Sequence, residues 1–185
     1  MRKIVVMMSI SLDGFVARPN GDLDWQLVDE ELHWHFNEVA KTMGVDLNGR
    51  VMWELMSSYW PTADADPDSS PPEVEFARIW RDMPKIVYSR TLDRADWNAT
   101  VVREVVPAEI MAMKAQPGGD MWLGGARIAA EFQRLGLIDE YRLYVHPVVI
   151  GEGQPLFVSP VPASMRLLET RTFGNGVVML RYEAA

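Results

Sequence analysis

The segment Met121-Trp122-Leu123-Gly124-Gly125-Ala126-Arg127-Ile128 decides how this chain is expected to fold. Its first three residues form an apolar run typical of a buried strand, and the two glycines end that strand. A helical pattern then continues over Ala126–Leu135, and Gly136 ends it. A strand that passes directly into a helix is the repeating unit of an α/β fold with a mainly parallel sheet.

The rest of the chain repeats this alternation. Further strands are predicted at Ile4–Ile10, Val45–Asn48, Lys85–Tyr88, Thr100–Val102 and Tyr141–Val149. Helices are predicted from Asp29 to Met43 and at Arg50–Tyr59, Phe76–Met83 and Pro107–Gln116. The acidic, Pro-rich stretch Pro61–Pro72 is predicted as a mobile surface loop. Met165–Phe173 and Val177–Tyr182 predict a hairpin, so the expected sheet is covered by helices on both faces and carries an antiparallel C-terminal edge.

Composition narrows the class of protein. The 185 residues are 48% hydrophobic and 24% charged, which predicts one globular domain over residues 1–185. The net charge of -8 argues against nucleic acid or an anionic membrane as a partner. There is no Cys, as expected in a reducing compartment, and the apolar run near the N-terminus fits a strand better than a targeting signal. We therefore expect a cytoplasmic protein.

Three strand ends share one chemical character. Asn48-Gly49-Arg50, Ser89-Arg90-Thr91 and Gly124-Gly125-Ala126-Arg127 each offer free backbone N–H groups and one Arg. Each alone is ordinary turn chemistry, but strand ends of a parallel sheet meet at one edge, where such groups bind phosphate. The sequence therefore predicts a phosphate or dinucleotide ligand, although it contains neither a G-x-G-x-x-G fingerprint nor a P-loop.

Few other residues indicate chemistry. His33 and His35 lie two apart on a predicted helix and point in different directions, so no metal site is expected. His146 precedes Pro147 in a predicted strand, where a structural role is the default. Trp25 ends a polar loop just before a carboxylate-rich helix start, where it either joins the core or stacks on a planar heterocycle.

The order of these motifs resembles the dihydrofolate reductase-like family, in its riboflavin-biosynthesis reductase branch (RibD C-terminal domain-like). The resemblance rests on the stretches Ser11–Gly14, Gly49–Arg50 with Trp53–Glu54, Lys85–Leu92, Trp122–Ala126, Leu137–Glu140 and Pro147–Phe157. It covers nearly the whole chain and implies a three-layer αβα fold. The activity implied is that of an NADPH-dependent reductase, acting on a small heterocycle of the 5-amino-6-(5-phosphoribosylamino)uracil type.

The resemblance also implies a cofactor site. The N-termini of two helices would bind the pyrophosphate, and the Ser-Arg-Thr turn would bind the 2'-phosphate. The loop after the first strand would close over the nicotinamide. The cofactor-binding residues would be Ala17, Asn48, Gly49, Arg50, Val51, Ser89, Arg90, Thr91, Leu123, Gly124, Gly125, Ala126, Arg127 and Ile128. By the same similarity, the Gly124–Gly125 peptide bond is expected to be cis.

The substrate half of the site is less defined. Folate reductases place one carboxyl group at the start of the first helix, which points to Glu31, with Asp13 as a second acid, while Trp25 would contact the substrate. The alternative is that Asp29, Glu30 and Glu31 only complement the helix dipole. Two other functions stay open: a dihydrofolate or pteridine-type reductase, and a cofactor-binding homologue without turnover. Related reductases often pair, so a homodimer is expected.

Overall fold

A computed structural model describes residues 1–158 and 164–184 of the chain. Its main sheet has the strand order β5-β4-β3-β6-β1-β7-β10-β9, and β2 and β8 form a separate small sheet. The strands are β1 (Ile4–Ile10), β2 (Phe15–Ala17), β3 (Met43–Gly49), β4 (Lys85–Tyr88), β5 (Ala99–Val102), β6 (Asp120–Gly124), β7 (Glu140–Val145), β8 (Gln154–Pro155), β9 (Met165–Thr172) and β10 (Val178–Ala184). The helices are α1 (Glu30–Ala40), α2 (Arg50–Ser57), α3 (Pro71–Asp82), α4 (Pro107–Ala115) and α5 (Ala126–Arg134), with a 3-10 turn at Trp60–Ala65.

The sheet is parallel except at one end. All pairings among β5, β4, β3, β6, β1 and β7 are parallel, whereas β10 is antiparallel to both β7 and β9. The prediction of a mainly parallel sheet with an antiparallel C-terminal hairpin is confirmed. Six strand ends therefore point to the same edge, which we call the carboxyl edge.

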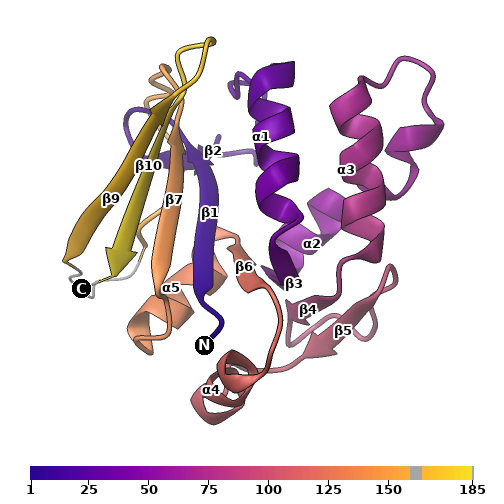
Figure 1. Cartoon of the computed structure of the whole chain (residues 1–185), viewed down its shortest axis with the longest axis vertical. Helices are drawn as coiled ribbons and strands as arrows, with labels where there is room; N and C mark the ends of the chain where they lie inside the picture. The colour runs from indigo at the N-terminus through magenta and orange to yellow at the C-terminus, as the bar shows by residue number, and fades with distance from the viewer. Residues whose placement is uncertain (159–163, 185) are drawn as a thin grey trace.

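Helices cover both faces of the sheet, which confirms the three-layer arrangement (Figure 1). Alternate residues of β1 make the two cores. Val6 and Met8 pack with α5 residues such as Phe132, and Val5 and Met7 pack with α1 and α3. Every second residue of a strand faces the same side, so the continuous apolar run of β1 fills both cores at once.

Several predicted boundaries are wrong. The first helix ends at Ala40, and Met43 already begins β3. The predicted loop over Pro61–Pro72 contains a 3-10 turn with buried Pro61 and the first residues of α3. Strand β7 stops at Val145, because the next residues turn across the carboxyl edge toward β8.

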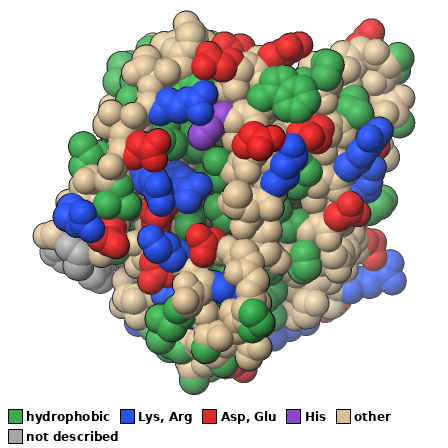
Figure 2. All heavy atoms as spheres, in the orientation of Figure 1, with side chains coloured by type: hydrophobic (Ala, Val, Ile, Leu, Met, Phe, Trp, Pro, Cys, Tyr) green, Lys and Arg blue, Asp and Glu red, His purple; other side chains and the backbone are tan. Residues whose placement is uncertain are grey.

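A buried ion network closes the opposite edge of the sheet. Glu140, at the start of β7, has no exposed side-chain surface and pairs with Lys3, Arg142 and Arg181. Arg181 also reaches Glu169 on β9. Figure 2 shows basic and acidic side chains interspersed over the face that is viewed in Figure 1, so that face carries no large field of one sign.

Candidate functional site at the carboxyl edge

The three strand ends singled out by their sequence lie side by side. Strand β3 is hydrogen-bonded to β4 on one side and to β6 on the other. In the register of these pairs, Gly49 lies opposite Tyr88 and Asn48 lies opposite Gly124. The sheet thus brings residues 48–50, 89–91 and 124–128 to one edge.

Beside these ends, the sheet is open between β1 and β6. The last residue pair of the two strands is Val6 with Leu123, but β1 continues to Ile10 with only β7 as a partner. The N–H of Gly125 meets the sulfur of Met8 at 3.3 Å instead of a strand carbonyl. Beyond Val6, the edge of β1 on the β6 side therefore has no strand partner among the described residues, and we call this unpaired edge the slot.

Two helices begin at the neighbouring strand ends, and β6 separates the α2 start on β3 from the slot. Helix α2 starts after Gly49 and α5 after Gly125, and neither first turn is capped by a side chain. Both glycines approach Ile128, since a Cβ at Gly49 or at Gly125 would lie 3.7 Å from its side chain. First-turn N–H groups from two helices converge on one place, as a pyrophosphate requires.

The turn before α5 differs from the prediction. The described residues contain no cis peptide bond, so the Gly124–Gly125 bond is trans and that prediction is wrong. The chain changes direction instead at Gly125, which has φ +102° and ψ 125°. An L-residue rarely adopts this conformation, which explains the glycine.

The turn after β4 is held by its own serine. The Ser89 hydroxyl accepts hydrogen bonds from the N–H groups of Thr91, at 3.2 Å, and Leu92, at 2.9 Å. Arg103 donates to the carbonyls of Ser89 and Leu92. Arg90 is exposed at the tip of this braced turn, where it is free to meet an anion.

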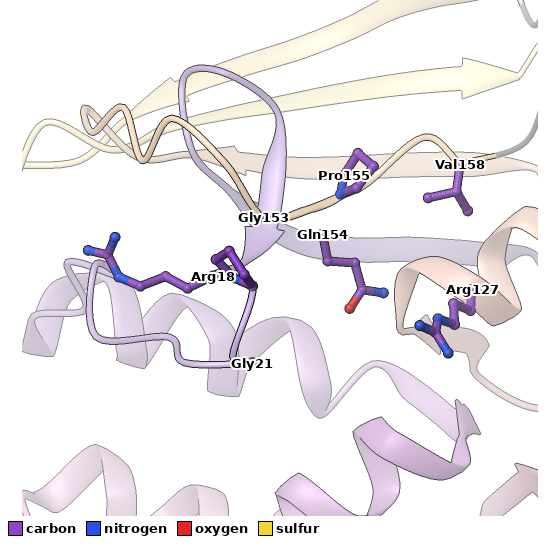
Figure 3. Close-up of a pocket in the computed structure, with 8 residues that line it drawn as sticks. Arg18, Gly21, Arg127, Gly153, Gln154, Pro155 and Val158 are labelled. Atoms are coloured by element: carbon purple, nitrogen blue, oxygen red, sulfur yellow. The ribbon is translucent and has the colours of Figure 1, made fainter.

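The three arginines of the strand ends are not equivalent. The Nη1 group of Arg50 donates to both carboxylate oxygens of Glu54, one turn further along α2. Arg127 lines a cleft of about 420 Å³, together with Arg18, Gly153 and Gln154. In Figure 3 the guanidinium of Arg127 and the amide of Gln154 face the same space, while Arg18 points away from them. Arg18 is held by Asp24 at 2.6 Å.

The small β2–β8 sheet forms one wall of this cleft, and sequence reasoning missed it. It pairs Ala17 with Gln154. A Cβ at Gly153 would lie 2.2 Å from the carbonyl oxygen of Ala17, so only glycine allows this approach. The Gly-x-Gly spacing of residues 151–153 was the available signal.

Both acids expected near the substrate are engaged elsewhere. The carboxylate of Glu31 accepts the N–H of Gly174 at 2.9 Å and lies 3.7 Å from Arg171. Asp13 accepts the N–H groups of Gly151 and Ile150. Its bond with the Ser11 side chain, followed by these two backbone bonds, lowers its pKa. Asp13 is thus tied to the turn at Ile150 and Gly151, and Glu31 ties α1 to the hairpin.

Asn48 is buried at the end of β3, on the other side of β6 from the slot, and its orientation is fixed. Its side-chain N–H donates to Asp46 at 2.7 Å, one strand repeat deeper. Burial raises the pKa of Asp46 to about 6. The Asn48 amide oxygen lies 2.9 Å from the position a Cβ would take on Gly124, so Asn48 packs against the turn that starts α5.

Trp25 and His146 meet at the end of β1. Trp25 is 4% exposed and His146 is fully buried, and their rings pack edge to face with centroids 5.4 Å apart. The N–H of His146 is bonded to the carbonyl of Ile10, which places the pair at the carboxyl edge. The structure thus adds His146 to the residues gathered at this edge, although its sequence context indicated only a structural role.

Two other classes of site have no support in the described chain. Between residues 1–158 and 164–184, no group of three or more His, Asp and Glu side chains is arranged to hold a metal ion. Among the helices of the same segments, none is both long and apolar enough to cross a membrane.

Comparison with known proteins gives one consistent result. The model of the RibD C-terminal domain family matches residues 2–179. The uncharacterized protein YyaP of Bacillus subtilis (strain 168) is 36% identical over 183 residues, which are 98% of this chain and 94% of YyaP.

Solved structures agree in fold. A candidate riboflavin biosynthesis protein of Shewanella sp. PV-4 superposes with a TM-score of 0.75 at 20% identity, and 99% of each chain is covered. A diaminohydroxyphosphoribosylaminopyrimidine deaminase/5-amino-6-(5-phosphoribosylamino)uracil reductase of Thermotoga maritima gives a TM-score of 0.66 at 14% identity. That match covers all of this chain and 57% of the Thermotoga protein.

Proposed function

The chain belongs to the RibD C-terminal domain family, and from this premise we propose that it is an NADPH-dependent reductase of a small oxo-heterocycle. The family is one of riboflavin-biosynthesis-type reductases, which supports an oxidoreductase at the coarse level. The proposed substrate class is that of 5-amino-6-(5-phosphoribosylamino)uracil, with hydride delivered to a C=N or C=O bond.

One observation carries the proposal. The uncapped N-termini of α2 and α5 both lie against Ile128, and the α5 start follows β6, the strand that borders the slot. Backbone N–H groups and helix dipoles bind a pyrophosphate, and a slot between strand ends accepts a flat ring. A dinucleotide needs both features within the reach of one ligand, and the residues present fit it.

Bound NADPH would supply the hydride, so the chain has to position and shield the reacting groups. The first turns of α2 and α5 would hold the pyrophosphate, and the turn at Ser89–Thr91 would hold the 2'-phosphate. Ala17 and the end of β1 would flank the nicotinamide. The cleft lined by Arg127 and Gln154 then holds the substrate, and water in that open cleft supplies the proton, because Glu31 and Asp13 are tied to backbone N–H groups.

Because Glu31 and Asp13 both accept hydrogen bonds from backbone N–H groups, a second function is also favoured, that of a cofactor-binding protein without turnover. The two functions differ in one measurement. An enzyme oxidises NADPH when 5-amino-6-(5-phosphoribosylamino)uracil is added, whereas a binding protein only retains NADPH. Absence of NADPH consumption at saturating substrate, with NADPH binding intact, selects the second function.

Arg90→Ala is expected to weaken NADPH binding about 10- to 100-fold and to leave NADH binding nearly unchanged. A charge-assisted hydrogen bond to a phosphate contributes about 1.5–3 kcal/mol, and only NADPH carries the 2'-phosphate. Fluorescence titration with each cofactor measures the difference. Arg94→Ala is the matched control, since Arg94 is exposed a few residues further along the same connection. Equal losses for NADPH and NADH would place the 2'-phosphate elsewhere.

A further inference from the structure

Two ring nitrogens at the end of β1 lack hydrogen-bond partners. Among the residues that the structure describes, neither Nε1 of Trp25 nor Nε2 of His146 has one, and both atoms are buried. Leaving a buried donor unpaired costs about 1–3 kcal/mol, so such groups are rare in folded proteins. Two of them in rings that touch each other require a physical reason.

The tautomer of His146 follows from its neighbour. The backbone N–H of Leu27 donates to Nδ1 of His146 at 3.0 Å, so Nδ1 carries no proton. Burial lowers the pKa of His146 to about 4, so the ring is neutral at physiological pH. The one ring proton is therefore on Nε2, and His146 and Trp25 present two N–H donors and no cation.

We propose that Trp25 and His146 form a paired N–H donor site for a ring carbonyl oxygen of the substrate. A carbonyl oxygen has two lone pairs and accepts from two donors at once, whereas a ring nitrogen accepts from one. Two neutral donors without a nearby cation suit a neutral acceptor better than a phosphate or carboxylate. The inference deepens the proposed function, on which it rests, by assigning the group that selects oxo-heterocycles.

The location of the pair agrees with this role. His146 directly follows Val145, which lies opposite Ile10 at the end of β1, and β1 is the strand that borders the slot. The donor pair and the slot therefore both lie at the carboxyl end of β1.

The segment 18–29, which joins β2 to α1, carries Trp25 and holds it against His146. Leu27 fastens this segment at two points, because its N–H binds His146 and its carbonyl accepts from the Asn175 side chain at 2.9 Å. One of the two fastening groups is the His146 ring itself. The segment therefore has to stay in place for the donor pair to exist, because its opening would remove Trp25 and release the Nδ1 bond that fixes the tautomer of His146.

The test uses uracil, which has two ring carbonyls, and pyrimidine, which has the same ring without oxygen. In the full-length 15N-labelled protein, uracil should move the Trp25 Nε1–H and His146 Nε2–H resonances downfield, and pyrimidine should not. Trp25→Phe removes one resonance and assigns it. Trp34→Phe, which alters a partly exposed Trp on α1, is the control for nonspecific effects.

Affinity gives a second readout. Trp25→Phe keeps a packed ring and deletes one donor, so uracil should bind about three- to tenfold more weakly. NADPH binding and circular dichroism check that the variant is folded. The inference is overturned if uracil moves neither resonance or only one, if pyrimidine acts equally, or if Trp25→Phe binds uracil like the wild type.

The two proposals fail separately. Loss of the uracil response with NADPH binding intact removes the donor site and keeps the reductase. A full uracil response without any NADPH binding keeps the donor site and removes the proposed reductase.

Discussion

A Gly125→Val variant is expected to bind NADPH about 100-fold more weakly than the wild type while remaining folded. Gly125 has φ +102°, which a β-branched residue cannot adopt without about 1–3 kcal/mol of strain. Relief of this strain turns the first N–H groups of α5 away from the slot, and each lost bond to a charged group costs about 1.5–3 kcal/mol. Calorimetric titration with NADPH measures the loss.

Gly136→Ala is the matched control for that variant. Gly136 lies just past the other end of α5, also at positive φ (+66°), and a Cβ there would meet no atom within 4 Å. It should lose about 1 kcal/mol of stability and keep the wild-type affinity for NADPH. An unchanged affinity in Gly125→Val, or an equal loss in Gly136→Ala, would show that the α5 start does not hold the cofactor.

Glu140→Gln is expected to lower the free energy of unfolding by about 3–5 kcal/mol and to leave NADPH affinity unchanged. The carboxylate is fully buried among Lys3, Arg142 and Arg181. The substitution removes the negative charge and leaves the positive charges of these three side chains without their partner. An uncompensated charge in a buried place lowers stability strongly. Urea denaturation monitored by circular dichroism gives the difference.

Glu169→Gln is the comparison for this variant. Glu169 pairs with the same Arg181 at 3.4 Å, but its side chain is half exposed. Surface pairs contribute about 0–1 kcal/mol. Similar losses in the two variants would contradict the central role of Glu140.

The same network predicts an acid-sensitive stability. Burial acts to raise the pKa of Glu140, but hydrogen bonds from Arg181 and Arg142 outweigh it and lower the pKa to about 2, from an ordinary value of 4.5. A lowered folded-state pKa stabilises the protein above the unfolded-state pKa, and this stabilisation is lost as the pH falls from about 4.5 toward 2. Wild type should lose more stability over this window than Glu140→Gln.

The sequence was sufficient for the fold because its strands carry clear local signals. The apolar run of β1 predicts a strand buried on both faces, and Gly124–Gly125 predicts the strand-to-helix turn. Parallel pairing then follows from the alternation of strands and helices. The three strand ends came together as predicted, because parallel strands end at one edge.

What the sequence did not predict depends on contacts between distant segments. β2 and β8 are three and two residues long and exist only because Gly153 lets Ala17 approach. The donor role of His146 depends on Leu27, which lies 119 residues away. The engagement of Glu31 depends on Gly174 in the hairpin. No local pattern encodes such pairs, so they appear only in the folded chain.

The central claim is that the carboxyl edge binds NADPH between α2 and α5. Its most direct test is a titration of the wild-type protein with NADPH and NADH, followed by quenching of Trp fluorescence. The proposed site predicts micromolar binding of NADPH and weaker binding of NADH. Binding of neither cofactor below about millimolar, where the standard binding free energy is only about -4 kcal/mol, would contradict it.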